Sequence, residues 1–486
     1  MKLFTTDLFD LIQSLNKAEK SFIKKESGNN SQTYLELFSD LEKLKVYDEK
    51  DFLKKQSKKQ YAGNYRFAKH YLYHFILDAL HRLYEEASTS AKISAQIHKA
   101  DVLLSKSLYR QAYVLLEKAV GNCEEEELFA LAIECYSRQY RIVFKGGYSI
   151  ERPELGRELC EKETTAASQL LLYSKLNALK NRLIVWLRKQ GNDAVKHQSE
   201  IKMILKAAEQ LQPEGGSSYK NQVLWQHTMA TGYFSLQNFE LALKYQRNLL
   251  AVYNQYQWRA AKEPYNYVSA INNLIMLQLE LGDTEDIESN FHLFEPFLKG
   301  LTEAKPPDIA IKAAEGAYNL RMRYGISYDQ LDEHFIEQTA KPFLEKHGDS
   351  VAINFRLNFH LHMAYYYCTQ LQFEKAQEAL MTVLHTMPKD IRSDLHLQAR
   401  IVEMIIHYEL GNPNLLPYLM DALLRKAQGK HKDLANALKI FFAESGINKS
   451  KAAKKLNQTL VAYKEKGANI PYPLEKVLML WAKSLL

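Results

Sequence analysis

The chain contains 486 residues, among them only 19 glycines and 12 prolines, and carries a formal net charge of +7 at pH 7. Gly and Pro stand well below their usual shares of about 7% and 5%, which excludes turn-rich β architectures and Pro/Gly-rich disordered chains. Strong helix formers such as Leu, Ala, Lys and Glu take their place, and the hydrophobic content of 46% is enough for a large core. The composition therefore predicts a helical globular chain.

The sequence shows no targeting signal. Residues 1–7 lack a basic segment followed by an apolar one, and no stretch approaches the roughly 18 uninterrupted apolar residues of a transmembrane helix. The four cysteines have no CxxC spacing, which favours reduced thiols over a disulfide scaffold or a zinc ribbon; they are Cys123, Cys135, Cys160 and Cys368. We therefore expect a cytoplasmic protein.

Residues 1–90 show helical periodicity without an internal repeat. Apolar residues recur at i, i+3, i+4 and i+7, which predicts a bundle with helices over residues 5–15, 17–26, 31–45, 48–57 and 62–87. Asn16 and Asp48 each precede one of these segments and are expected N-caps. The segment SLNKAEKSF at residues 14–22 is similar to the opening of a group of uncharacterised bacterial helical-repeat proteins. This resemblance concerns helical-repeat proteins and carries no biochemical activity with it.

Residues 91–424 contain a repeated pattern. In three segments that align without gaps, two alanines lie 12 residues apart and an aromatic residue stands three before the second alanine; the alanine pairs are Ala100 and Ala112, Ala230 and Ala242, and Ala364 and Ala376. Small side chains let two antiparallel helices approach closely, and aromatic rings fill the wider space beside them. The pattern resembles the tetratricopeptide repeat (TPR), a helix-turn-helix unit of about 34 residues. This resemblance implies an all-α superhelix of antiparallel helix pairs.

Two weaker units follow the same plan. One runs from Asn272 through Gly282-Asp283, with Ile287 where the second alanine should stand, and the other occupies residues 397–424. The sequence thus predicts an N-terminal helical bundle over residues 1–90, a TPR-like array over residues 91–424 and basic C-terminal capping helices over residues 425–486.

No known catalytic signature is present. The sequence lacks GxxxxGK[ST], a GxGxxG that follows a strand, HExxH, GxSxG and the protein-kinase motifs. We therefore expect a chain without enzymatic activity and without a cofactor.

The TPR resemblance implies a binding groove, because the first helix of each unit lines the concave face of such arrays and long concave faces hold peptides. The groove candidates are His227, Thr231, Phe234, Asn272, Met276, Leu361 and Tyr365. Asn can pair with a peptide backbone, and Tyr offers an apolar body with a polar tip. The alternative is that such aromatic residues only fill space between helices. We expect a scaffold that binds a protein or a peptide.

A stripe of polar residues raises the question of a metal site. His70, His74, Asp78 and His81 share one face if residues 62–87 form a single helix. Imidazole and carboxylate ligands on one face can hold a divalent transition metal. The alternative is a solvated surface stripe, because neighbouring apolar residues supply the packing faces without it. We expect no bound metal.

Nucleic acid binding is the rival hypothesis, because both ends of the chain are basic. The net charge is +4 over residues 1–70, −6 over residues 71–424 and +9 over residues 425–486. Two segments, 40–57 and 445–456, have the layout of a helix-turn-helix, although the second lacks the usual turn glycine and arginines for base edges. The candidate phosphate contacts are Lys50, Lys54, Lys55, Lys449, Lys451, Lys454 and Lys455. In that case the chain would be a DNA-binding regulator with a ligand- or peptide-sensing array.

Overall fold

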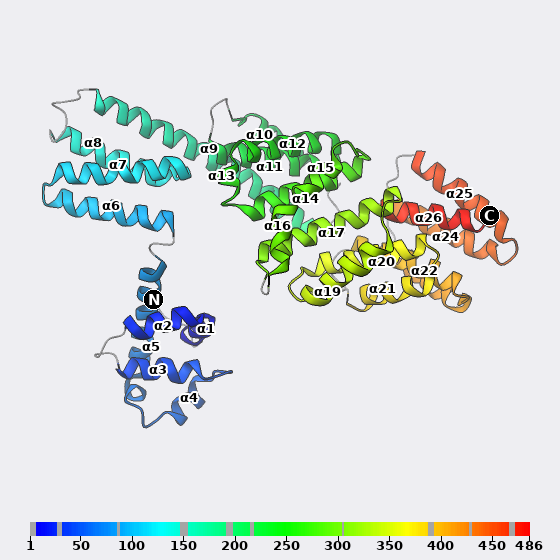
Figure 1. Ribbon diagram of the computed structural model, residues 1–486, viewed down its shortest axis with the longest axis horizontal. Helices are drawn as coiled ribbons and strands as arrows, with labels where there is room; N and C mark the ends of the chain where they lie inside the picture. Colours follow the sequence, from blue (N-terminus) through cyan, green and yellow to red (C-terminus); the bar gives the residue numbers. More distant parts are fainter. Residues whose placement is uncertain are drawn as a thin grey trace. The chain divides into compact units, whose positions relative to one another are not determined.

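The computed structural model describes residues 6–26, 32–84, 88–145, 154–190, 198–213, 218–303, 306–386, 393–426, 430–465 and 472–486. Over these residues the chain is helical and contains no β-strand (Figure 1). The predicted all-α fold is confirmed. Within the same ranges, no helix combines the length and the apolar character that a bilayer span requires.

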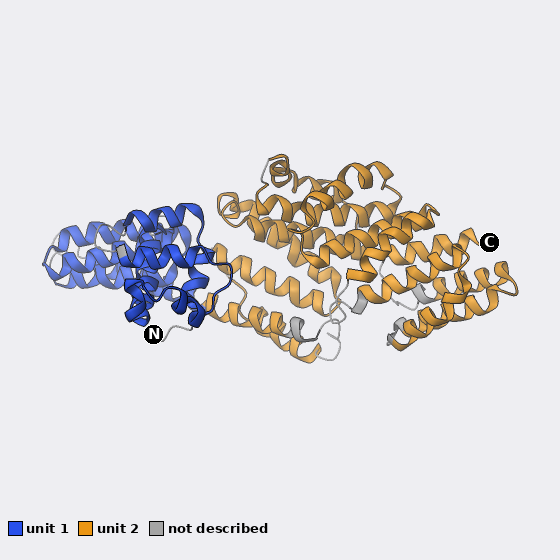
Figure 2. Cartoon of the chain, turned by 90° about the horizontal axis from the view of Figure 1, so that it is seen from below, with its two compact units in different colours: residues 1–171 blue, residues 172–486 orange. Residues whose placement is uncertain are grey.

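The chain forms two compact units, residues 1–171 and residues 172–486 (Figure 2). The structure thus draws its main boundary inside α9, and the predicted division at residues 90 and 424 stays a prediction. The helices of unit 1 are α1 (Asp7–Ser14), α2 (Lys17–Glu26), α3 (Gln32–Glu42), α4 (Glu49–Lys55), η2 (Gln60–Asn64), α5 (Tyr65–Tyr84), α6 (Thr89–Ser105), α7 (Tyr109–Glu126), α8 (Phe129–Phe144) and the first part of α9 (Leu155–Gln190).

Both expected N-caps in unit 1 are confirmed. The Asp48 carboxylate accepts a 2.9 Å hydrogen bond from the backbone N–H of Asp51 at the start of α4. Asn16 and Glu19 form a reciprocal capping box at the start of α2, in which each side chain accepts from the other residue's backbone N–H, at 2.9 and 2.6 Å. These caps fix the starts of α2 and α4. Helices α1–α5 together bury one apolar core around Ile12, Phe38 and Ile76.

Unit 2 is a row of antiparallel helices in which each packs on its neighbour (Figure 1). Beyond the second part of α9, its helices are α10 (Gln198–Glu209), α11 (Tyr219–Ser235), α12 (Phe239–Gln255), α13 (Gln257–Ala260), α14 (Pro264–Leu281), α15 (Ile287–His292), α16 (Glu295–Leu298), η4 (Lys299–Thr302), α17 (Asp308–Tyr328), α18 (Glu333–Phe335), η5 (Ile336–Ala340), α19 (Lys341–His347), α20 (Ile353–Thr369), α21 (Phe373–Thr386), α22 (Ser393–Glu409), η6 (Pro413–Leu415), α23 (Leu416–Lys426), α24 (Lys430–Ser445), α25 (Lys449–Glu465) and α26 (Tyr472–Ser484).

The same backbone turn ends the first helix in all three clear repeat segments. Its left-handed residue is Ser107, Gln237 or Leu371, with φ of 61°, 60° and 56°, and each stands seven residues after the first alanine. The next residue donates its backbone N–H to a carbonyl five residues earlier; the pairs are Leu108 to Leu103 (3.0 Å), Asn238 to Tyr233 (3.0 Å) and Gln372 to Tyr367 (2.9 Å). This is the Schellman geometry of a helix C-terminus. The repeat is therefore one of backbone conformation as well as of sequence.

The weaker units close with this turn too. Gly282 and Gly411 have φ of 68° and 73°, and the corresponding hydrogen bonds from the following residues are both 2.9 Å. A further copy follows α17, where Asp329 has φ of 56° and the bond back to Gly325 is 2.8 Å. The sequence pattern did not show this unit, because no paired alanines mark it. The structure thus supports a helical repeat of antiparallel pairs.

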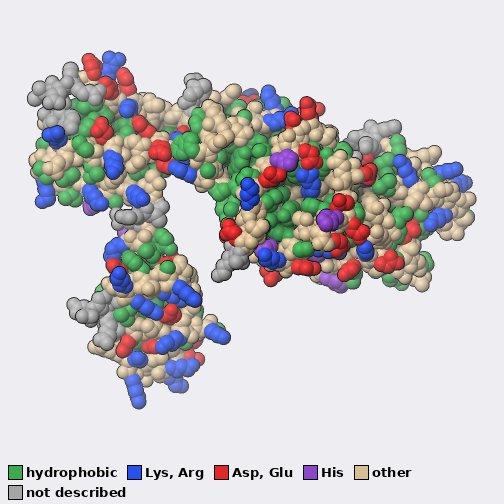
Figure 3. All heavy atoms as spheres, in the orientation of Figure 1, with side chains coloured by type: hydrophobic (Ala, Val, Ile, Leu, Met, Phe, Trp, Pro, Cys, Tyr) green, Lys and Arg blue, Asp and Glu red, His purple; other side chains and the backbone are tan. Residues whose placement is uncertain are grey.

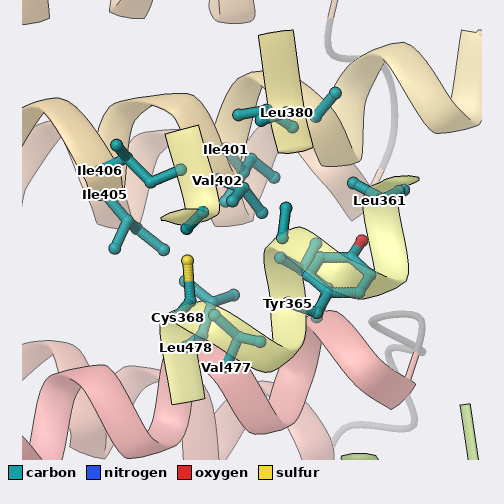
Figure 4. Close-up of a cluster of buried hydrophobic side chains, with 14 of the residues drawn as sticks. Leu361, Tyr365, Cys368, Leu380, Ile401, Val402, Ile405, Ile406, Val477 and Leu478 are labelled. Carbon is teal, nitrogen blue, oxygen red and sulfur yellow. The ribbon is translucent and has the colours of Figure 1, made fainter. Parts of the chain in front are cut away.

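Helix α26 does not extend the row. It packs against α17, α20 and α25, so it lies over two first helices of earlier pairs. In Figure 4, Val477 and Leu478 of α26 point toward Cys368 of α20. The ammonium group of Lys476 pairs with the Asp329 carboxylate and also donates to the Ser327 carbonyl at the end of α17. This region of the array is therefore covered by the chain itself.

Candidate functional site

A cleft of about 270 Å³ opens in unit 2 between α9, α11, α12 and α14. Its polar lining includes Lys180 from α9, His227 from α11 and Asn273 from α14. The other residues that line it are Tyr173, Tyr219, Lys220, Val223, Leu224, Leu249, Tyr253, Glu263, Asn266, Ser269 and Ala270. Helices α11 and α14 supply most of this lining.

Aromatic side chains form the floor of the cleft. The ring of Tyr219 lies edge-to-face against Tyr253 and Tyr256, with centroids 6.1 and 5.5 Å apart. Burial is the main cause that raises the pKa of Tyr253, and Glu263 adds to it. Tyr219 and Tyr253 are only 2% and 3% exposed, so these rings close the bottom of the cleft as part of the core.

His227 is the titratable group at the centre of the lining. Burial, and then the charge of Lys180, lower the pKa of His227 to about 4, so the ring is neutral at pH 7. Its Nδ1 atom is shielded from solvent and has no hydrogen-bond partner among the described residues. The Nε2 atom is thus the ring nitrogen that can meet a ligand, as a donor or as an acceptor depending on the tautomer.

The α14 wall of the cleft carries three polar residues on one helix face. Asn266, Ser269 and Asn273 follow at intervals of three and four residues. The Asn266 amide donates a 2.9 Å hydrogen bond to the Glu263 carboxylate. The side chains of Ser269 and Asn273 form no hydrogen bond within the described part of the chain. They are therefore available to a ligand.

Of the three predicted groove residues of α11, only one lines the cleft. His227 lines the cleft, whereas Thr231 and Phe234 lie farther along the helix and outside the lining. Phe234 is 38% exposed, and its ring centroid is 5.8 Å from that of Phe239. It therefore covers the junction between α11 and α12.

The predicted groove residues of α14, Asn272 and Met276, do not line this cleft. Asn272 faces α17, where its Oδ1 lies so close to Gly316 that a Cβ on that glycine would come within 2.7 Å. Met276 packs against the apolar core. The next residue, Asn273, lines the cleft in place of Asn272. The spacing of Asn266, Ser269 and Asn273 was the signal in the sequence that could have identified this face.

The prediction that Leu361 and Tyr365 of α20 line an open groove is wrong, because each side chain is only 1% exposed. The Tyr365 hydroxyl donates a 2.8 Å hydrogen bond to Gln398 of α22. Figure 4 shows both side chains in the same buried cluster as Ile401 and Val402 of α22. Packing of α22 on one side and of α26 on the other makes these residues part of the core, not of an open groove.

The lysines of the nucleic acid hypothesis divide into two groups. Lys50, Lys54 and Lys55 are exposed around α4 and form no ion pair within the described residues, and Figure 3 shows other basic side chains over the N-terminal helices. The helix itself has only seven residues and is anchored by the buried Phe52. It is a short candidate for a recognition helix.

The second group lies on α25. Lys455 forms a 2.6 Å ion pair with Glu444, and the ammonium group of Lys449 stands 5.5 Å above the ring of Tyr408. Lys451 and Lys454 are exposed. Two of the four candidate lysines therefore serve contacts inside the protein.

The histidine stripe of α5 lies on an exposed face. His70, His74, Asp78 and His81 are all exposed, and the rings of His70 and His74 are 4.4 Å apart. Within the ranges that the structure describes, no three His, Cys, Asp or Glu side chains are placed to hold a metal ion. The stripe thus has the placement of a solvated surface.

The sequence matches no protein-family model and no curated protein. The function of the cleft is therefore argued from its own geometry and chemistry.

Proposed function

We propose that the chain is a TPR-like interaction module that binds a segment of a protein or peptide in the cleft between α9, α11 and α14, with no chemistry of its own. The observation that carries this proposal is the row of polar side chains on α14 in one cleft with the ring of Tyr173, which is 36% exposed. An extended peptide presents backbone donors and acceptors, which Asn side chains can pair, and apolar side chains, which aromatic surface can cover.

The proposal places the partner in one part of the array. Later first helices are covered, because α20 is enclosed by α22 and α26. The cleft beside α11 and α14 has no such cover among the described residues. We further propose a cytoplasmic location, which four free cysteines support.

Panning of a random dodecapeptide display library against the full chain tests this function. Ser269→Trp fills the cleft from an exposed position, so we expect the enriched peptides, as synthetic probes, to bind this variant at least about tenfold more weakly, a loss of about 1.4 kcal/mol. Leu281→Trp is the matched control, since Leu281 is exposed on the same helix outside the cleft. Enriched peptides that bind both variants alike would refute the proposal.

DNA binding is the second candidate function, and the unpaired Lys50, Lys54 and Lys55 favour it. Phosphate contacts release counterions, so the affinity for a random duplex would fall steeply with salt, with a log–log slope of about −0.9 per contact. Changing all three lysines to glutamine would then reduce the slope by up to roughly 2.7. A wild-type chain that does not bind the duplex at low ionic strength excludes this function.

A further inference from the structure

The cleft holds a half-buried cation whose charge no described residue neutralises. Lys180 lines the cleft from α9 and forms no ion pair within the described ranges. The carboxylate of Glu263, which also lines the cleft, accepts a hydrogen bond from Asn266. Lys180 is therefore available to an anionic group of a ligand.

Lys180 and His227 line the same cleft. The charge of Lys180 contributes to keeping the His227 ring neutral, and the ring has a shielded Nδ1 without a partner. An anion placed beside them would be attracted by the ammonium group and would accept a hydrogen bond from Nε2–H of His227. The pair thus offers two donors to one carboxylate.

The surroundings favour a carboxylate on a side chain over one at a chain end. Lys180, His227 and Asn273 lie in helix interiors, where backbone N–H groups are bonded within the helix. Capture of a chain terminus commonly uses a nest of free backbone N–H groups. These three residues therefore offer side-chain donors, and we assign the carboxylate beside them to a side chain of the ligand. Tyr219 and Lys220, at the start of α11, line the same cleft, so a chain end is the alternative that the test must separate.

We propose that the cleft selects an acidic peptide segment, with the carboxylate of an Asp or Glu side chain bound between Lys180 and His227. This inference rests on the proposed peptide-binding function and names the chemistry that the ligand must carry. The exposed ring of Tyr173 then covers an apolar neighbour in the same segment, and Asn273 pairs with its backbone.

The bound carboxylate couples binding to proton uptake. In the free protein the pKa of His227 is about 4, and an adjacent carboxylate raises it. Protonation then adds a charge-assisted hydrogen bond, so affinity increases as the pH falls from 7 toward 5, while the peptide carboxylate stays mostly ionised. The other charged groups of the lining are Lys220 of α11 and Glu263, and α12 contributes Tyr253. On α10, the Glu209 carboxylate accepts a hydrogen bond from the Tyr233 hydroxyl.

The test uses a library-selected dodecapeptide and the full chain, with affinity measured by fluorescence anisotropy at pH 5.5, 6.5 and 7.5. Exchange of the peptide's acidic residue for its amide, Glu for Gln or Asp for Asn, is expected to weaken binding at least about tenfold. Amidation of the peptide C-terminus is expected to have no effect. In Lys180→Met the acid and amide peptides should bind alike, and in His227→Gln the increase in affinity at low pH should disappear. Thermal unfolding verifies that both variants are folded.

The outcomes separate the inference from the function on which it rests. Suppose that Ser269→Trp abolishes binding of the peptides, but that the acid and amide forms bind the wild type equally well. This result would overturn the acidic selectivity and leave the proposed peptide binding in place. If affinity falls only when the peptide C-terminus is amidated, the bound carboxylate is that of the chain end, and its assignment to an Asp or Glu side chain is overturned. If no enriched peptide depends on the cleft, the proposed function fails together with this inference.

Discussion

The indole N–H of Trp481 in α26 donates a 2.7 Å hydrogen bond to the carboxylate of Glu409 at the end of α22. Trp481 is 2% exposed, and its ring lies against those of Tyr408 and Phe441, with centroids 5.8 and 5.0 Å away. One side chain thus combines a buried polar contact with the aromatic packing that holds α26 on the array.

Removing this side chain should destabilise unit 2. We expect Trp481→Ala to lower the free energy of unfolding by about 3–5 kcal/mol, because a large aromatic residue leaves a cavity. Trp481→Phe keeps most of the packing but leaves the Glu409 carboxylate without its donor, at a cost of about 1–3 kcal/mol. Urea unfolding gives both values, with Leu486→Ala as the exposed control. Equal midpoints for Trp481→Ala and the wild type would contradict the packing.

The left-handed turns predict opposite effects for two kinds of substitution. Gly411→Ala should cost about 1 kcal/mol, because its φ of 73° disfavours a Cβ even though the space around it is open. Gln237→Gly relieves the same strain and should stabilise by up to about 1 kcal/mol. Gly446→Ala is the matched control, since that glycine also has open space but no positive φ. A loss of stability in the control equal to that in Gly411→Ala would show that φ is not the cause.

Gly325→Ala tests the turn after α17. Helix propensity alone predicts a gain of about 1 kcal/mol for this exchange inside a helix. A Cβ on Gly325 would, however, come within 2.5 Å of the Cβ of Leu331 and within 2.9 Å of its backbone N and Cα, which cannot move independently of the turn. We expect a net loss of about 1–3 kcal/mol, measured by urea unfolding. A stabilised variant would mean that this turn is more open than the structure shows.

Stability should fall in mild acid because of buried histidines. Burial, with the charge of Arg323, lowers the pKa of His362 to about 3, against about 6.5 in an unfolded chain. Below pH 6.5 the unfolded state therefore binds a proton that the folded state does not, and at pH 5 this one group opposes folding by about 2 kcal/mol. His362→Gln should flatten the pH dependence between pH 7 and pH 5 by that amount. An unchanged slope would show that the ring is protonated in the folded protein.

Local features of the fold could be predicted from sequence, because they depend on neighbouring residues. Asn16 and Asp48 cap helices as their types and positions predicted, and the alanine pairs marked helix pairs that share one turn geometry. On α14 the cleft is lined by Asn273 and not by the predicted Asn272, since a repeat pattern fixes which residues are buried between paired helices and not which face of a helix borders a cleft.

The covered part of the array could not be predicted in the same way. Leu361 and Tyr365 occupy the positions that correspond to His227 and Thr231, yet they are buried where His227 lines a cleft. The difference arises from α22 and α26, and no local pattern shows that α26 returns to α17 and α20. Lys180 was missed because it belongs to α9, outside the aligned segments.

The return of α26 changes how unit 2 can fold. Most repeat arrays need contacts only between neighbours, so pairs can form one after another as the chain is synthesised. Here the ammonium group of Lys476 donates a hydrogen bond to the carbonyl of Ser327, 149 residues earlier in the sequence. The surface of α17 and α20 that α26 covers can therefore be buried only after residues 472–484 have been synthesised. Until then the apolar side chains that α26 covers on α17 and α20 stay exposed, so folding of this part of unit 2 depends on a contact between residues far apart in the sequence.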